Sequence, residues 1–147
     1  MILTLPIAQA HFIWYCAWLS VPSAVYAYAH PAATHFAPIP AAVFATSLLY
    51  WRNPIRDSWR RTLDIAVVST GLTYQSYYVY SSDAIPNSTK QIYSTLIGIS
   101  AMCYASSAYL MTRGRIWNAT YAHASVHLFA NIANIVLYYG TSITHTK

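Results

Sequence analysis

The sequence predicts an all-α protein: a polytopic transmembrane bundle of five helices with the N-terminus inside and the C-terminus outside. Three observations lead to this prediction. Five apolar stretches nearly fill the 147 residues. Charged residues make up only 7% of the chain and hydrophobic residues 56%, whereas a soluble domain has about a quarter charged residues. The basic residues gather in the connections on one side of the implied membrane.

Each stretch is close to the roughly 20 residues that a helix needs to cross a bilayer, although the second is shorter. No connection is long enough to hold a further unit, so residues 1–147 are expected to form a single integral membrane domain. The predicted spans run from Ala8 to Ala29, Phe36 to Trp51, Thr62 to Ser81, Gln91 to Thr112 and Thr120 to Thr141.

The first two spans contain prolines that shape their geometry. Pro22 is expected to kink the first span, and Pro38 and Pro40 suit the entrance of the second. The small-x-small pattern at Ala27-Tyr28-Ala29 resembles a signal-peptide cleavage site. However, the first residues carry no positive charge and the apolar run is too long for a signal peptide, which favours a true span.

The later connections are polar. Asn53-Pro54 indicates a turn, and Asp57 to Arg61 could form a short interfacial helix. Residues 81–89 form the main outer loop, where Asn87-Ser88-Thr89 is a glycosylation sequon whose use stays open.

Cys16 and Cys103 both fall inside spans, so no outer disulfide is expected.

The orientation follows from the arginines in the even-numbered connections. Positive charge is retained on the cytoplasmic side during insertion, or on the matrix or stromal side in an organelle. Lys90 and Lys147 lie on the opposite side. This bias accounts for most of the net charge of +5, so a nucleic-acid partner is not expected. The inner side holds Arg52, Arg56, Arg60, Arg61, Arg113 and Arg115.

Aromatic residues agree with these two sides, because Trp and Tyr prefer membrane interfaces. Trp14, Trp51, Trp59 and Trp117 fall near the predicted inner side. The mean hydropathy of +0.35 is modest because the spans are rich in Ala, Ser, Thr and Tyr, a composition that favours close contacts between helices.

The last span carries a polar stripe. His123 and His127 are four residues apart and share one helix face, which Asn131, Asn134 and Tyr138 continue. Such a stripe is expected to face protein or water rather than lipid. Two imidazoles one turn apart can bind one metal ion. The alternatives are hydrogen bonding between helices and a haem held by His127 together with His11.

Asp64 is the only acidic residue inside a predicted span. An intramembrane carboxylate is a functional-site candidate, and the alternative is a first-turn acid that pairs with Arg60 or Arg61. Topology places Asp64 in the same membrane half as Ser47 and the two histidines.

The order Ser47-x3-Trp51, then Asp64, then His123-x3-His127 resembles the alkaline ceramidase, adipose-receptor and GPI-anchor lipid-remodelling superfamily, called CREST. Its members are seven-helix membrane hydrolases or presumed hydrolases. The resemblance implies zinc held by the two histidines. It also implies catalytic roles for Ser47 and Asp64 in positioning a water that attacks a lipid amide or ester.

The chain departs from that family in two ways. Trp51 stands where the family has a histidine ligand, and five spans replace seven. An indole nitrogen only donates a hydrogen bond and cannot bind zinc. His11, Asp64 or a water would have to complete the metal shell.

We therefore predict a small multi-pass integral membrane protein that acts as a non-catalytic structural or accessory component. Its expected partners are membrane lipids and other membrane subunits. One alternative is a divergent zinc-dependent lipid amide or ester hydrolase of the CREST type. A second is a transporter or channel component with a polar path from the histidines past Asn131 and Asn134.

Overall fold

The structure is a computed structural model that describes residues 3–144, and within that range it contains helices and no strand. The predicted all-helical class is confirmed. The α-helices are α1 (Ile7–Cys16), α2 (Ser20–Ala29), α3 (Pro38–Trp51), α4 (Trp59–Ser81), α5 (Asn87–Thr112) and α6 (Ile116–Thr144). Two 3₁₀ segments, η1 (Ala17–Leu19) and η2 (Pro31–Phe36), lie between the early helices.

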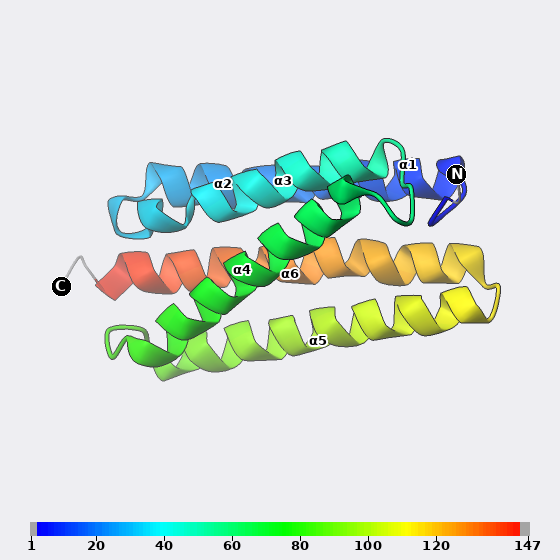
Figure 1. Ribbon diagram of the computed structural model, residues 1–147. Coiled ribbons are helices and arrows are strands. Elements are labelled where there is room, and N and C mark those ends of the chain that lie inside the picture. The colour runs from blue at the N-terminus through cyan, green and yellow to red at the C-terminus, as the bar shows by residue number, and fades with distance from the viewer. Residues whose placement is uncertain (1–2, 145–147) are drawn as a thin grey trace.

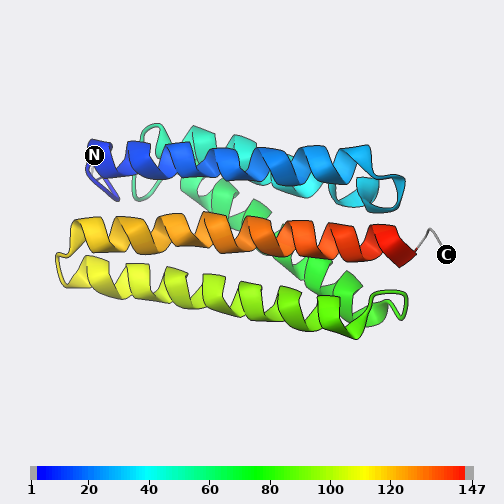
Figure 2. The same ribbon diagram turned by 180° about the vertical axis from the view of Figure 1, so that it is seen from behind.

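The first predicted span is two α-helices rather than one, so the predicted number of five helices was wrong. Figures 1 and 2 show α1, η1 and α2 as one continuous rod, and the bundle therefore has five rods. Pro22 has no backbone N–H to donate to the carbonyl of Trp18, four residues earlier. That carbonyl accepts from a backbone N–H at the end of η1 instead, and the rod tightens into 3₁₀ geometry there.

Three helices begin earlier than their apolar stretches. The α4 helix starts at Trp59, where the side chain of Ser58 caps it by accepting the backbone N–H of Arg61 at 3.4 Å. The separate short helix expected between Asp57 and Arg61 is therefore wrong. Polar residues also form the first turn of α5, which hydropathy does not mark, and α6 begins at Ile116, before its predicted stretch.

The rods run antiparallel, with α6 between the layer of α1, α2 and α3 on one side and α5 on the other (Figure 1). The α4 helix crosses this bundle diagonally. The start of α1, the α3–α4 connection and the α5–α6 connection meet at one end of the bundle. Gly114 turns the chain between α5 and α6 with φ +69°, a conformation that glycine adopts without strain.

That end carries the arginines of both connections and is called the basic end below. The α2–α3 and α4–α5 connections lie at the opposite end. The alternation of predicted spans assigned the same connections to the inner side. In the structure, the antiparallel rods place them at one end of the bundle. The basic end comprises Arg52, Arg56, Arg60, Arg61, Arg113 and Arg115.

Polar side chains are buried inside the bundle beside an apolar core, and many large apolar side chains lie on its outside. All six helices expose large hydrophobic side chains: Val25 is 61% exposed, Met102 71% and Tyr28 77%. Within residues 3–144, no helix combines the length and apolar character needed to cross a membrane. The buried polar residues are Ser20, Ser23, Thr46, Ser47, Gln75, Thr89, Ser100, Ser107, Thr120, His127, Asn131 and Thr141.

Candidate functional site

The carboxylate of Asp64 is held by two hydroxyl groups of α3. Thr46 Oγ1 donates to Asp64 Oδ1 at 2.8 Å, and Ser47 Oγ donates to the same oxygen at 2.9 Å. Hydrogen bonds to an ionised acceptor are stronger than neutral ones. These two bonds therefore fix α4 against α3 close to the basic end.

Asp64 does not occupy the first turn of its helix. Because α4 begins at Trp59, Asp64 is one turn deeper than its position in the predicted span indicated, and the first turn contains no acid. The alternative in which Asp64 complements the helix start and pairs with Arg60 or Arg61 was wrong. Its recorded hydrogen-bond partners are hydroxyls.

The two histidines of α6 contact aromatic rings and each other. The ring centroids of His123 and Trp51 are 4.9 Å apart in an edge-on arrangement, and those of His123 and His127 are 5.8 Å apart. Tyr104 of α5 lies 6.1 Å from His123. His127 and Trp51 are buried, with 9% and 4% of their surfaces exposed.

One face of α3 connects these two groups. Ser47 and Trp51 are four residues apart and therefore lie on the same side of the helix, one turn from each other. Ser47 contacts Asp64 of α4, and Trp51 contacts His123 of α6. The residues that the sequence singled out thus lie around the last turns of α3, and we call them the α3 cluster: Ser47, Trp51, Asp64, His123 and His127.

The α3 cluster fits a zinc ion only in part. Zn–N bonds of about 2.1 Å place two imidazole centroids on one ion roughly 5 Å apart, close to the 5.8 Å between His123 and His127. A catalytic zinc needs three protein ligands. The third position is taken by Trp51, whose buried Nε1 has no hydrogen-bond partner and cannot accept a metal.

The residues expected to complete a metal shell do not join the pair. Within residues 3–144, no three side chains of His, Cys, Asp or Glu are grouped so that they could hold a metal ion. His11 is exposed on α1, whereas His127 is buried. Among the described residues, neither His11 nor Asp64 therefore joins the histidine pair as a third ligand, which leaves a water as the remaining option.

A second group of polar side chains lies one turn further along α6. The sequence did not predict which residues contact Asn131. Asn131 Oδ1 accepts from Ser23 Oγ at 2.8 Å, and Asn131 Nδ2 donates to Ser20 Oγ at 3.2 Å and to the carbonyl of His127 at 2.7 Å. The polar stripe of α6 thus faces protein at this position, as predicted. The three-residue spacing of Ser20 and Ser23, which puts both on one face of α2, was the available signal.

Beyond Asn131 the stripe is surrounded mainly by apolar side chains. An apolar cluster that includes Phe36, Val79, Ala133 and Leu137 lies beyond Asn131. Phe36 stacks on Tyr138 with centroids 5.1 Å apart. The Tyr138 hydroxyl accepts a hydrogen bond from Gln75 Nε2 at 2.8 Å.

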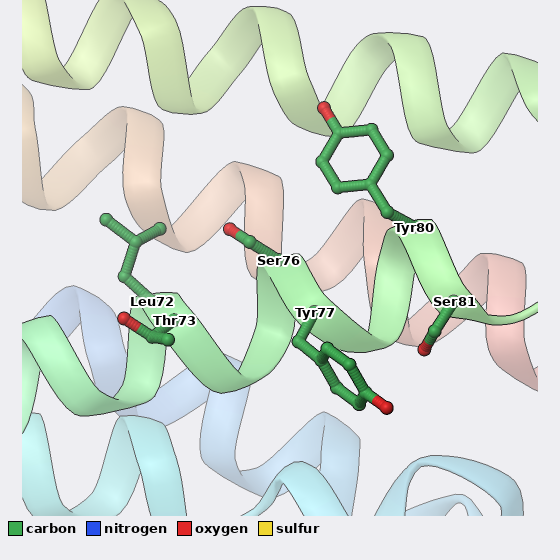
Figure 3. A pocket seen from close by; sticks show the side chains of 6 residues that line it. All are labelled: Leu72, Thr73, Ser76, Tyr77, Tyr80 and Ser81. Atoms are coloured by element: carbon green, nitrogen blue, oxygen red, sulfur yellow. The ribbon is translucent and has the colours of Figure 1, made fainter.

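Hollows on the described surface lie away from the α3 cluster. One, of about 640 Å³, lies along α4 beside Leu72, Ser76 and Tyr80 (Figure 3). Tyr80 points toward α5 in this view, in keeping with its hydrogen bond of 2.8 Å to Ser94. Another, of about 470 Å³, lies between the start of α5 and the end of α6.

Comparison with family models, curated proteins and solved structures finds no match for this chain. The resemblance to the CREST superfamily therefore depends on the α3 cluster alone.

Proposed function

We propose that this chain is a small integral membrane protein that acts as a non-catalytic structural or accessory component of a membrane assembly. The observation that carries the proposal is that every α-helix exposes large apolar side chains, while hydroxyl, amide and imidazole groups are buried inside the bundle beside its apolar core. A bundle in water would expose charged and polar faces.

The placement of charge supports the same proposal. The charged residues of the helices are Arg60 and Arg61 in the first turn of α4, Lys90 in the first turn of α5, and Asp64. The remaining length of these helices, which would lie at the level of the hydrocarbon, carries no charge. A charged side chain in hydrocarbon is energetically costly, so a membrane helix is expected to lack charge over this length.

Helix lengths are compatible with a bilayer. The helices α4, α5 and α6 contain 23, 26 and 29 residues, and about 20 residues cross the hydrocarbon core. The mean hydropathy of a helix counts inward-facing and lipid-facing residues alike. Ser, Thr, Asn and His side chains that bond within the bundle therefore lower that mean without meeting lipid.

An accessory role is supported by an exposed face of small residues on α5. Gly98, Ala101, Ala105 and Ala108 are all exposed, and an atom added at Gly98 would meet nothing within 4 Å. Their spacing of three and four residues places them on one side of the helix. Small residues on such a face let a second membrane helix approach closely.

The insertion and the orientation are tested together by cysteine labelling. In a Cys16→Ser/Cys103→Ser background, Asn53→Cys probes the basic end and Asp83→Cys the opposite end, both at exposed positions. We expect the chain to resist alkaline-carbonate extraction. An impermeant maleimide added to intact cells should label Asp83→Cys, and Asn53→Cys should react only after permeabilisation.

Release of the chain by carbonate would overturn the membrane proposal, and reversed labelling would overturn the orientation. The accessory role is tested by the size of the complex that mild detergent extracts from the native membrane. It should exceed a single chain in a micelle, and Ala105→Leu should reduce it.

A divergent zinc-dependent lipid amide or ester hydrolase is the second candidate. It is favoured by the contact of Ser47 with Asp64 and by the pairing of His123 with His127 around the same helix. These residues provide two of the three ligands that a catalytic zinc requires, so no reaction step is assigned to them.

Elemental analysis of the purified wild-type chain separates the two candidates. The accessory proposal predicts zinc well below one ion per chain, and the same result in the His123→Ala/His127→Ala variant. Stoichiometric zinc that the double variant loses would favour the hydrolase instead. The protein should be purified in detergent without chelator so that weakly held metal is retained.

A further inference from the structure

The basic end has more positive charge than the chain itself can neutralise. Four arginines of two connections that lie far apart in sequence are at this end, together with Arg60 and Arg61 in the first turn of α4, and Asp57 is the only acid in those connections. The nearest further carboxylate, Asp64, accepts hydrogen bonds from Thr46 and Ser47. The geometry therefore leaves an excess of positive charge at one end of the bundle.

The contacts of these arginines within the chain are weak. Arg61 Nη1 donates to the carbonyl of Arg56 at 3.5 Å, and the guanidinium of Arg113 lies 5.3 Å from the ring centroid of Tyr109. Arg52, Arg56, Arg113 and Arg115 are exposed. Their donor groups are therefore available to a ligand.

Membrane topology alone does not explain why the basic residues at this end are arginines rather than lysines. Orientation during insertion is set by lysine and arginine alike, yet the six basic residues named at this end are all arginines, and Lys90, the lysine that the structure describes, lies at the opposite end. The planar guanidinium presents a fork of donors that matches phosphate oxygens in a bidentate way, whereas the ammonium group of lysine acts as a point charge.

Exposed tryptophans place these arginines at the depth of lipid headgroups. Trp59 is 69% exposed and directly precedes Arg60, and Trp117 is 45% exposed and lies two residues after Arg115. Trp117 belongs to an aromatic cluster with Phe12 and Tyr121, with ring centroids 6.4 and 5.7 Å away. Indole rings prefer the boundary between hydrocarbon and headgroups, and phosphates lie just beyond that boundary.

We propose that the basic end binds the phosphate groups of anionic phospholipids in the inner leaflet. The inference rests on the proposed membrane function and adds a ligand class to it. Arginines of the two connections hold the phosphates, and Trp59 and Trp117 pack against the adjoining glycerol and upper acyl region. A nucleic acid would meet the same charge, but the tryptophans on the sides of the helices favour lipid.

The test is native mass spectrometry of the detergent-solubilised chain supplied with equal amounts of phosphatidylglycerol and phosphatidylcholine. We expect the wild type to retain phosphatidylglycerol selectively. Each arginine neutralised near a membrane surface is expected to lower the binding of anionic lipid roughly five-fold. The Arg113→Gln/Arg115→Gln variant should therefore lose most of the selectivity.

Two matched variants separate the arginine site from general charge. Lys90→Gln removes a positive charge at the opposite end and should leave the selectivity unchanged. Arg113→Lys/Arg115→Lys keeps the positive charge but removes the bidentate guanidinium groups. Its loss of phosphatidylglycerol selectivity should be smaller than that of Arg113→Gln/Arg115→Gln. Equal retention of both lipids by the wild type would overturn the proposal, as would an equal loss in Lys90→Gln.

Competition identifies the source of the phosphate. Inorganic phosphate in excess should not displace the bound phosphatidylglycerol, and a single-stranded oligonucleotide should not displace it either; displacement by either one would overturn the lipid assignment. Failure of the membrane proposal is recognised separately, because a chain that is not inserted is extracted by alkaline carbonate whichever lipid it retains.

Discussion

Gly140→Leu is expected to destabilise the bundle clearly, because α5 and α6 leave little room for a side chain there. A Cβ atom at Gly140 would lie 2.5 Å from Thr89 Cγ2 and 3.0 Å from Thr89 Cβ. Thr89 is itself buried, with 8% of its surface exposed. Rotation of its side chain would move Cγ2 and Oγ1 but not Cβ, so one helix still has to shift by a few tenths of an ångström.

The expected cost exceeds the gain in helix propensity. Overpacking of a well-packed interior costs about 1–3 kcal/mol, while replacing glycine inside a helix returns about 1 kcal/mol or less. Gly140→Ala should therefore give a small loss of stability, and Gly140→Leu a clear one. Thermal unfolding in detergent, followed by circular dichroism, measures both.

Gly98 provides the matched control. It lies in the interior of α5, is exposed, and a Cβ atom there would meet nothing within 4 Å. Gly98→Leu should therefore leave the unfolding temperature unchanged or raise it slightly. If Gly140→Leu unfolds at the same temperature as Gly98→Leu, the close approach of α6 to Thr89 is wrong.

The presence of each rod could be predicted from the sequence, because few structures other than a long helix accommodate a long apolar stretch. The ends of the rods could not, since the first turn of α5 consists of Asn87, Ser88, Thr89 and Lys90, none of which is apolar. The 3₁₀ segment before Pro22 was expected as a kink. Its position follows from the missing donor to the carbonyl four residues earlier, which is a property of the backbone rather than of hydropathy.

Topology predicted that the residues of the α3 cluster lie at one level of the bundle, because alternating antiparallel rods put the end of α3 and the starts of α4 and α6 at the same end. The partners of Asp64 were only half found. Ser47 was placed in the same membrane half as Asp64, Thr46 was not singled out, and Arg60 or Arg61 was considered as the partner. An error of three residues in the start of α4 moved Asp64 from the second turn to the first, where an acid has a different role.

The sequence did not predict which side chains of distant helices form hydrogen bonds with each other. The bonds from Ser20 and Ser23 to Asn131 join α2 to α6, which are separated by more than a hundred residues. The order of helices along the chain does not determine which rods are neighbours in a bundle. The membrane orientation, the zinc site and the accessory role all stay predictions.

Trp51→His is expected to convert the α3 cluster into a zinc site with about one ion per chain. The residue at position 51 contacts His123, with ring centroids 4.9 Å apart, and His123 lies 5.8 Å from His127. Histidine is smaller than tryptophan and brings a nitrogen that can accept a metal. The substitution supplies the third imidazole that a zinc site needs and frees the volume of the indole for the ion.

Trp51→Phe is the control, because it removes the indole without adding a ligand and should bind no more zinc than the wild type. The Trp51→His/His127→Ala variant should lose the metal again. Elemental analysis measures all of these variants, and the chelator concentration needed to strip zinc ranks their affinities. Zinc in Trp51→His no higher than in Trp51→Phe would show that the side chain at position 51 does not point toward the histidine pair. Zinc in Trp51→His alone would instead show that one aromatic side chain separates this cluster from a three-histidine centre.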